Sequence, residues 1–276
     1  MSDSSTLVDS ALVKPFTKVF EKHGLDLTRY KFSFLKRRMD IRMRTRDVSD
    51  YLQYAAILNN EPSEFVELFQ TLSINVTSFF RDNEVYAEVS SFIKTIIENA
   101  KPTDQIRVWS AGCATGEEPY SIAILFNEAL YKKNISVNIT ATDVSQKALD
   151  FARDGKYSSS SLKTTSKNFI DKYFQSIWQK DDAVEYQINQ NLKQMVTFKL
   201  GDILSAGIQF FDIIFCRNVL IYYTKDAHEL IFSKFHKSLK KNGLLVLGMD
   251  ETMLGTNGEK LFRSMMPRER IYQKIE

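Results

Sequence analysis

The stretch VWSAGCATGEEPYSIAILF, residues 108–126, decides the fold because it changes from a strand pattern to a helix pattern within a few residues. Its first residues are apolar, its middle holds Gly112 and Gly116, and the apolar positions that follow recur at helical spacing. A glycine-rich turn of this kind is typical of α/β sheets, whose ligands bind beyond the carboxyl ends of the strands. Such turns usually hold phosphate, yet this one continues directly into Glu117 and Glu118.

The rest of the chain after residue 106 alternates short apolar runs with helical patterns. The runs are apolar on both faces, as buried parallel strands are. The expected strands are 106–110, 137–142, 196–200, 212–216 and 244–248, and the expected helices are 119–132, 145–153 and 227–240. This alternation predicts βαβ units and an α/β fold with a Rossmann-like, doubly wound sheet.

Two regions depart from this alternation and predict the domain organisation. Residues 1–80 have apolar side chains at helical spacing, which predicts an all-α N-terminal domain, followed by a linker at 81–90. Residues 156–194 begin with a polar run and continue with a period of two in AVEYQINQNL. We therefore expect a small antiparallel β-subdomain at about 156–194, inserted into an α/β domain that spans 91–276.

Composition sets limits on the class of protein. A net charge of +3 gives no argument for nucleic acid, and Cys113 and Cys216 form no CxxC pair that would hold a metal. The N-terminus lacks the pattern of a signal peptide, and no apolar run approaches the roughly 20 residues that span a bilayer. We expect a cytoplasmic monomer without a metal and without membrane insertion.

The acidic turn indicates a ligand other than a phosphate. Dinucleotide turns read G-x-G-x-x-G, whereas Gly112 and Gly116 give G-x-x-x-G, and Glu117 and Glu118 would repel a pyrophosphate. Asp143, after the next expected strand, can accept hydrogen bonds from ribose hydroxyls. S-adenosylmethionine has a ribose and two cationic groups and no phosphate, and it fits this set. The competing interpretation is that the glutamates only favour the helix dipole.

Four motifs, in order along nearly the whole chain, resemble the chemotaxis receptor methyltransferase (CheR) family. They are SINVTSFFRD (73–82), VWSAGCATGEEPYSIA (108–123), ITATDVSQKALDFARDGKY (139–157) and FDIIFCRNVLIYY (211–223). The resemblance implies an N-terminal helical domain and a Rossmann-like domain with a β-subdomain. It also implies the reaction, in which S-adenosylmethionine methylates glutamates on the cytoplasmic helices of chemoreceptors and leaves S-adenosylhomocysteine.

The resemblance also assigns cofactor contacts by position in the motifs. These fall on Asn75, Thr77, Arg81, Gly112, Glu117, Glu118, Asp143, Asp202, Ile203, Arg217 and Asn218. Relatives often carry an Asn-Leu pair where this chain has Asp202 and Ile203.

A glutamate acceptor is ionised at neutral pH and needs no strong base, so the catalytic task is positioning. Our candidates for positioning the acceptor are Arg81, whose planar fork matches a carboxylate, and the hydroxyl of Tyr222. The alternatives are a salt bridge for Arg81 and core packing for Tyr222.

The stretch TRYKFSFLKRRMDIRMRTRD, residues 28–47, is strongly basic. Arg38, Arg42 and Arg46 recur every fourth residue, so a helix places them on one face. We expect this face to dock an acidic receptor helix, the alternative being a solvated face. Nucleic acid would also bind such a stripe, but CRNVLIYY stands where a base methyltransferase would carry an N-P-P-Y-like motif.

Two other functions stay open from the sequence. One is a methyltransferase that acts on a small molecule or on nucleic acid. The other is a signalling module that binds the cofactor without turnover. Activity on receptor fragments separates both from a protein-glutamate O-methyltransferase.

Overall fold

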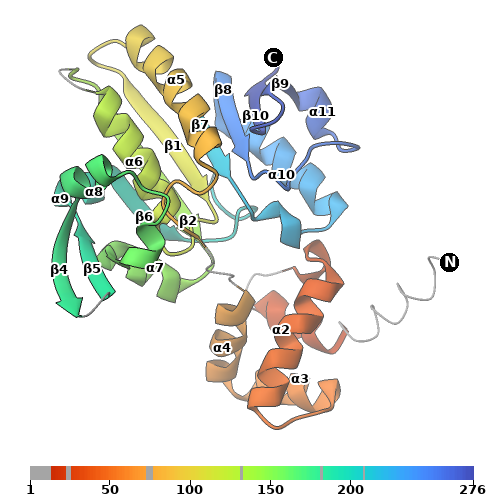
Figure 1. Ribbon diagram of the computed structural model, residues 1–276. Coiled ribbons are helices and arrows are strands. Elements are labelled where there is room, and N and C mark those ends of the chain that lie inside the picture. Colours follow the sequence, from red (N-terminus) through yellow and green to blue (C-terminus); the bar gives the residue numbers. More distant parts are fainter. Residues whose placement is uncertain (1–13, 23–25, 73–76, 131–132, 181–182, 208) are drawn as a thin grey trace. The chain divides into compact units, whose positions relative to one another are not determined.

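The computed structural model describes residues 14–22, 26–72, 77–130, 133–180, 183–207 and 209–276 (Figure 1). The chain divides into two compact units. They are Met1–Ile74 with Tyr222–His228, and Asn75–Ile221 with Glu229–Glu276. Each unit has its own hydrophobic core.

The N-terminal unit is helical. Residues 14–22 are helical, and they are followed by η1 (Leu27–Arg29), α2 (Phe32–Thr45), α3 (Tyr51–Asn60) and α4 (Pro62–Leu72). The Asp50 carboxylate caps α3 by accepting from the Leu52 and Gln53 amides. Apolar side chains from all of these segments form the core, among them Phe16, Phe20, Leu27, Leu35, Met39, Tyr54, Leu58, Phe65 and Leu68.

Two arginines of the expected docking stripe are paired inside this unit. Arg42 donates to both carboxylate oxygens of Glu64 on α4, at 2.9 and 2.7 Å, and Arg46 donates to Glu61 at 2.7 Å. The Tyr54 hydroxyl also donates to Glu64, at 2.9 Å. The prediction of a free basic face is therefore wrong for these two residues, because that face of α2 is directed at the acidic side of α4.

The second unit contains a seven-stranded sheet. Its strands are β1 (Gln105–Ala111), β2 (Ser136–Asp143), β6 (Val196–Leu200), β7 (Phe211–Cys216), β8 (Leu239–Leu247), β9 (Phe262–Met266) and β10 (Ile271–Lys274). The order is β6-β2-β1-β7-β8-β10-β9, and β10 alone runs antiparallel to its two neighbours. This confirms the doubly wound sheet and the five expected strands, while β9 and β10 were not predicted.

Helices cover both faces of this sheet, as Figure 1 shows. They are α5 (Asn83–Asn99), α6 (Glu117–Ala129), α7 (Gln146–Asp154), α10 (Lys225–Ser238) and α11 (Gly258–Leu261). Val108 of β1 lies in the core that α5 and α6 share, and its neighbour Trp109 stacks edge-on against Phe235 of α10 at 5.4 Å. The expected linker at 81–90 is wrong, since Val85, Tyr86 and Val89 of α5 are buried in this core.

The inserted subdomain is confirmed. It runs through β3 (Lys156–Ser158), η2 (Ser159–Leu162), α8 (Lys167–Tyr173), β4 (Phe174–Lys180), β5 (Ala183–Ile188) and α9 (Gln190–Met195). Its three strands form an antiparallel sheet in the order β3-β5-β4. The sheet lies beside α7 (Figure 1), to which Gln187 joins it by donating to the Asp154 and Gly155 carbonyls at 2.8 and 3.0 Å.

The strand order reverses between β1 and β7. From β1 the chain proceeds outward through β2 to β6, and from β7 it proceeds the other way through β8. In open parallel sheets, ligands bind at the carboxyl ends of the strands beside such a reversal. The ends of β1, β2 and β7 therefore locate the candidate site.

Within the described ranges, no helix has the length and low polarity of a bilayer crossing.

The buried carboxylate of Glu64 gives the first prediction. Burial alone would raise its pKa, but hydrogen bonds from Arg42 and Tyr54 and the charge of Arg46 outweigh burial and hold the pKa below its ordinary value. Glu64→Gln leaves the Arg42 charge buried, so we expect the unit to lose about 3 kcal/mol of stability. Hydrogen exchange of α2 and α4 peptides in the full chain measures this loss.

The matched control is Glu67→Gln on the same helix. Glu67 lies 3.8 Å from Arg42 but is 54% exposed, so its loss should cost less than about 1 kcal/mol. Because the pKa of Glu64 is lowered by folding, its contribution is present above about pH 4.3 and fades as the pH falls further. Equal protection in both variants, at neutral and at acidic pH, would contradict a stabilising Arg42–Glu64 pair.

Candidate functional site at the carboxyl ends of the strands

The turn between β1 and α6 uses its backbone amides within the protein. Gly112 and Cys113 both donate to the Thr142 carbonyl, at 2.8 and 3.0 Å, and Gly116 donates to the Cys113 carbonyl at 3.0 Å. Ala114 donates to the carboxylate that ends β2, at 2.8 Å. Phosphate-binding turns direct such amides at the ligand instead. These four amides are therefore not arranged to hold a phosphate, in agreement with the acidic residues that follow.

The two glycines of this turn are required by the protein's own packing. Gly112 and Gly116 have φ values of +82° and +95°. A Cβ at Gly112 would lie 2.5 Å from Val219 Cγ2, and one at Gly116 would lie 2.7 Å from Ala152 Cβ and 2.9 Å from the Tyr157 hydroxyl. The sequence predicted that they admit a ligand, whereas the close neighbours in the structure are side chains. Contact of Gly112 with the cofactor stays a prediction.

Asp143 fixes the carboxyl end of β2 against the turn. Its side chain is buried, and its two oxygens accept from the amides of Ala114 and Ser145, at 2.8 and 2.9 Å. Each carboxylate oxygen can accept more than one hydrogen bond. The same group can therefore hold the turn and receive ribose hydroxyls at the edge of the sheet.

Glu118 and Glu117 are both buried at the start of α6. Glu118 accepts from the Ser110 hydroxyl at 2.8 Å and lies 3.8 Å from Arg217, and Glu117 accepts from the Thr115 hydroxyl at 2.6 Å. Burial raises the pKa of both carboxyls, and the Arg217 charge opposes the rise at Glu118. A cation bound beside Glu118 would favour its charged form further.

Arg217 connects the end of β7 to the start of α5. Its guanidinium donates to the Asp82 carboxylate at 2.6 Å and to the Arg81 carbonyl at 2.8 Å, and it lies 5.3 Å from the centre of the Tyr86 ring. The side chain is only 2% exposed. The structure thus shows Arg217 as an internal tie, and a contact with the cofactor stays a prediction.

The N-x-T-x-F-F-R motif is described only in part. Asn75 lies outside the described residues, and Thr77 and Arg81 are half-buried. Burial raises the pKa of Glu118, and the charge of Arg81 is among those that oppose this rise. Arg81 is therefore close enough to act electrostatically on Glu118, at the start of α6.

Two further predicted pairs follow β6 and β7. The Asp202 side chain accepts from the Leu204 amide at 2.7 Å and so closes the turn after β6, while Ile203 is buried. Asn218 follows Arg217 with a φ of +59°, in the left-handed region where asparagine is among the more common residues after glycine. Both pairs end strands at the same edge of the sheet as Asp143, and their cofactor contacts stay predictions.

Tyr222 is grouped with the N-terminal unit. It ends the short helix η3 (Leu220–Tyr222), its carbonyl accepts from the Lys31 amide at 2.9 Å, and its ring centre lies 4.7 Å from that of Phe34. The structure therefore shows the packing role that was the alternative for Tyr222. Its role in positioning the acceptor stays a prediction.

Sequence reasoning missed two carboxylates of this region. Asp82 pairs with Arg217, and Glu251 is buried in the segment after β8. Glu251 could have been found by the signal that identified Asp143, an acid shortly after an apolar strand. Asp82 had no such signal, because its partner lies 135 residues away in the chain.

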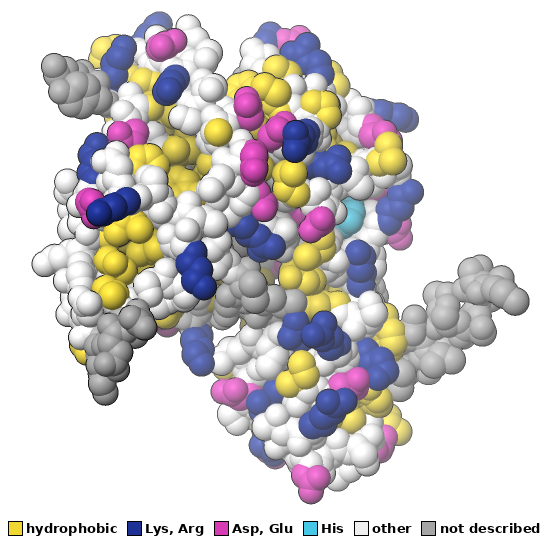
Figure 2. Space-filling model, viewed as in Figure 1, with side chains coloured by type: hydrophobic (Ala, Val, Ile, Leu, Met, Phe, Trp, Pro, Cys, Tyr) yellow, Lys and Arg dark blue, Asp and Glu magenta, His cyan; other side chains and the backbone are white. Residues whose placement is uncertain are grey.

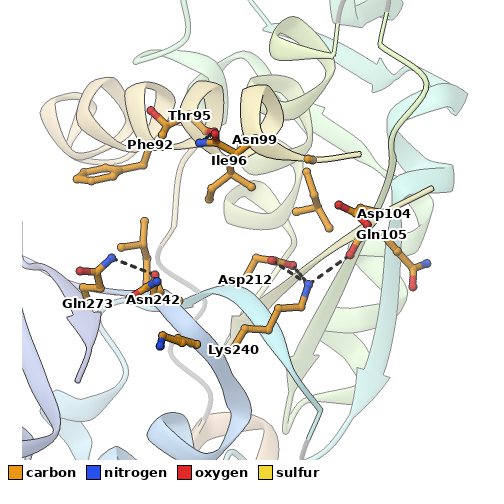
Figure 3. A pocket seen from close by; sticks show the side chains of 15 residues that line it. Phe92, Thr95, Ile96, Asn99, Asp104, Gln105, Asp212, Lys240, Asn242 and Gln273 are labelled. Carbon is orange, nitrogen blue, oxygen red and sulfur yellow. Dashed lines mark hydrogen bonds and ion pairs between the residues drawn. The ribbon is translucent and has the colours of Figure 1, made fainter. Parts of the chain in front are cut away.

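A cavity of about 590 Å³ lies at the opposite edge of the sheet, between α5 and the amino ends of the strands (Figure 3). Lys240 contacts both oxygens of Asp212 there, at 2.9 and 2.8 Å, and Gln273 donates to the Asn242 carbonyl at 3.2 Å. This cavity presents a matched ion pair, whereas the carboxyl edge concentrates buried carboxylates. We therefore place the candidate site at the carboxyl edge.

The described part of the chain holds no group of three or more His, Cys, Asp and Glu side chains placed to bind a metal ion. Cys113 and Cys216 are both buried and not joined in a disulfide. Burial raises the pKa of each thiol well above its ordinary value, which opposes formation of a thiolate.

The glycine turn between β1 and α6 gives a prediction about stability. Gly116→Ala forces a Cβ against Ala152 and Tyr157 at a positive φ, so we expect a loss of about 2 kcal/mol or more. Gly207→Ala is the control, because a Cβ there meets nothing within 4 Å. Chemical unfolding of the full chain compares the two. Equal stability of the two variants would contradict the packing role of Gly116.

Two family models match the chain. The model described as CheR methyltransferase, SAM binding domain, matches residues 75–269, and the CheR all-alpha domain matches residues 14–73. An S-adenosylmethionine-bound amino pentose methyltransferase from Micromonospora echinaspora, a solved structure, aligns at 17% identity with a TM-score of 0.36, covering 60% of this chain and 49% of its own.

Relatives with a curated description give the same family. A chemotaxis protein methyltransferase of Borreliella burgdorferi is 30% identical over 259 residues, covering 90% of this chain and 89% of the relative. One of Salmonella typhimurium is 31% identical over 257 residues, covering 91% and 86%. The match to the helical domain is followed in the sequence by the match to the S-adenosylmethionine-binding domain, and the relatives align over most of the chain. The chain therefore belongs to the CheR family of chemotaxis methyltransferases.

Proposed function

We propose that this chain transfers a methyl group from S-adenosylmethionine to glutamate side chains on the cytoplasmic helices of chemoreceptors. The observation that carries the proposal is the set of buried carboxylates at the reversal of strand order. Glu118 and Asp143 lie there beside the glycine turn, whose backbone amides donate their hydrogen bonds to acceptors within the protein. Such a site favours a cationic ligand with hydroxyl groups over a phosphate ester.

The chain's residues fit this cofactor by the chemistry of their donors and acceptors. Asp143 would accept from the ribose hydroxyls, and Glu118 supplies negative charge near a positive group. Asp202 and Ile203 follow β6, and Asn218 follows β7; these strands flank β2 and β1 in the sheet, so all three residues would also border the cofactor. When bound, S-adenosylmethionine supplies a methyl group on a sulfonium, which a carboxylate oxygen can attack.

The acceptor glutamate brings its own nucleophile. A carboxylate is ionised at neutral pH, so the chain has to orient it and does not have to remove a proton. Arg81 suits this task because its fork matches two carboxylate oxygens and its charge acts in the region of Glu118. Exclusion of water and alignment of the reacting atoms would supply most of the acceleration.

The structure supports a different receptor-docking face of α2 from the one expected from sequence. Arg42 pairs with Glu64 of α4, Arg46 pairs with Glu61 just before α4, and the half-buried Arg38 lies over the Phe34 ring at 5.5 Å. Arg37 and Arg44, by contrast, are exposed and lie about two turns of helix apart on one side. Lys and Arg side chains also gather over this unit in the space-filling view (Figure 2).

The exposed side of α2 is not purely charged. Ile41 lies between Arg37 and Arg44 in the sequence and is 39% exposed. A helix with acidic and apolar residues on one face would match this mixture. We propose that Arg37, Ile41 and Arg44 form the receptor-docking face in place of the stripe predicted from sequence.

The function is tested by incubating the full chain with tritium-labelled S-adenosylmethionine and cytoplasmic fragments of receptors. We expect label in the receptor fragment that is released as methanol by mild base, as a methyl ester requires. Base-stable label would indicate a different acceptor atom. Binding of S-adenosylhomocysteine without any transfer to receptor fragments would instead favour a non-catalytic module.

The docking face generates its own prediction. We expect Arg37→Glu with Arg44→Glu to reduce receptor methylation at least tenfold and to leave the affinity for S-adenosylhomocysteine unchanged. The cause is lost attraction to an acidic helix, so methylation by the unmodified chain should also weaken with added salt, which screens charges beyond about 8–10 Å.

The matched control is Lys14→Glu with Lys18→Glu, which reverses the same amount of charge at exposed positions of the same unit. This control should methylate receptor fragments normally. An equal loss in both double variants would show that net charge matters and that the face does not.

A further inference from the structure

Glu251 is a buried carboxylate that has no part in the methyl transfer proposed above. It lies after β8 and is 3% exposed. One of its oxygens accepts from the amides of Val219 and Leu220, at 2.7 and 2.6 Å, and the other accepts from the Gly248 amide at 2.7 Å. Each of these partners is a backbone donor, so the side chain serves only as an acceptor for them.

The segment that Glu251 holds is the turn after β7. Burial raises the pKa of Glu251, and the amides of Gly248, Val219, Leu220 and Asn218 oppose the rise. Asn218 has a φ of +59°, in the left-handed region that asparagine adopts more readily than most residues, so the chain turns sharply here. The carboxylate thus gathers the amides of three successive residues, 218–220, onto a single group.

This turn meets the glycine turn of β1 through one side chain. A Cβ on Gly112 would lie 2.5 Å from Val219 Cγ2, so the Val219 side chain packs directly against the Gly112 backbone. Glu251 fixes the backbone of Val219, and Val219 covers Gly112. Two segments that border the candidate cofactor site are therefore held in register by a residue outside it.

We propose that Glu251 is a positioning residue of the cofactor site, acting through the backbone of residues 218–220 and the side chain of Val219 on the turn at Gly112. This inference rests on the proposed cofactor site at the carboxyl edge of the sheet. The loss of Glu251 should free the amides of the turn after β7 from their common acceptor and let Asn218 move away from the cofactor.

A purely structural carboxylate in the same unit provides a comparison. Asp212 accepts from the Arg107 amide at 2.8 Å and from Lys240 at 2.8 Å, at the opposite edge of the sheet. It resembles Glu251 in capping backbone, but it does not border the candidate site. If Glu251 only stabilised the fold, Glu251→Gln and Asp212→Asn would affect ligand binding alike.

The experiment measures the dissociation constant of S-adenosylhomocysteine by calorimetry for the full chain and its variants, below the onset of their thermal melts. We expect Glu251→Gln to weaken binding at least tenfold and Asp212→Asn to change it less than twofold. Glu251→Asp keeps the charge with a shorter reach and should also weaken binding; it replaces Glu251→Gln if that variant does not fold.

A double variant tests the route through Val219. Val219→Ala alone should weaken binding several-fold, because the cover over Gly112 is shortened. If Glu251 acts through Val219, adding Val219→Ala to Glu251→Gln should weaken binding less than twofold further, since residues acting through one contact are not additive. Effects that multiply would overturn this route.

Equal affinity of the unmodified chain and Glu251→Gln would overturn the positioning role, as would equal losses in Glu251→Gln and Asp212→Asn. Failure of the unmodified chain to bind S-adenosylhomocysteine would be a different result. That result would contradict the proposed cofactor site itself, and the titration of the unmodified chain is sufficient to detect it.

Discussion

The buried guanidinium of Arg217 is the interaction on which the carboxyl edge of the sheet depends. It pairs with Asp82 at 2.6 Å and faces Glu118 at 3.8 Å, so one positive charge serves carboxylates from two helices. Removing a partner from such a buried set leaves an uncompensated charge, which is costly. Phe80, Asp82 and Asn218 all have positive φ values next to this group. Positive φ values therefore occur on both chain segments that Arg217 joins, the one before α5 and the one after β7.

The carboxyl ends of the strands carry buried acids, and the amides of the glycine turn are not directed at a ligand as those of a phosphate site are. Asp143 closes the turn of β1, Glu251 closes the turn of β7, and Glu118 lies between Ser110 and Arg217. Each acid has a structural partner as well as a proposed part in binding. The same contacts that build the edge thus decide that it suits a cationic, hydroxylated ligand.

Patterns local to one segment were sufficient to predict most of the fold. Apolar runs gave the five parallel strands, and the change of period at 156–194 gave the inserted subdomain. β9 and β10 were missed because FRSMM and IYQK are short and carry polar residues. The acids after β1 and β2 were found because parallel strands bring their carboxyl ends to one edge.

Partners distant in sequence could not be predicted. A spacing of four placed Arg42 and Arg46 on one face of α2, but only the packing of α4 shows that Glu61 and Glu64 lie against that face. Likewise, no pattern in the sequence indicated that Val219, far along the chain, packs against Gly112. Periodicity identifies a face without identifying what covers it.

A crystal structure of the full chain with S-adenosylhomocysteine would test the proposed cofactor site most directly. We expect the ribose hydroxyls to contact the Asp143 carboxylate and the sulfur to lie at the ends of β1 and β7. Binding elsewhere, such as in the cavity beside Lys240 and Asp212 at the amino edge, would contradict it. So would a ribose that contacts no carboxylate at the carboxyl edge.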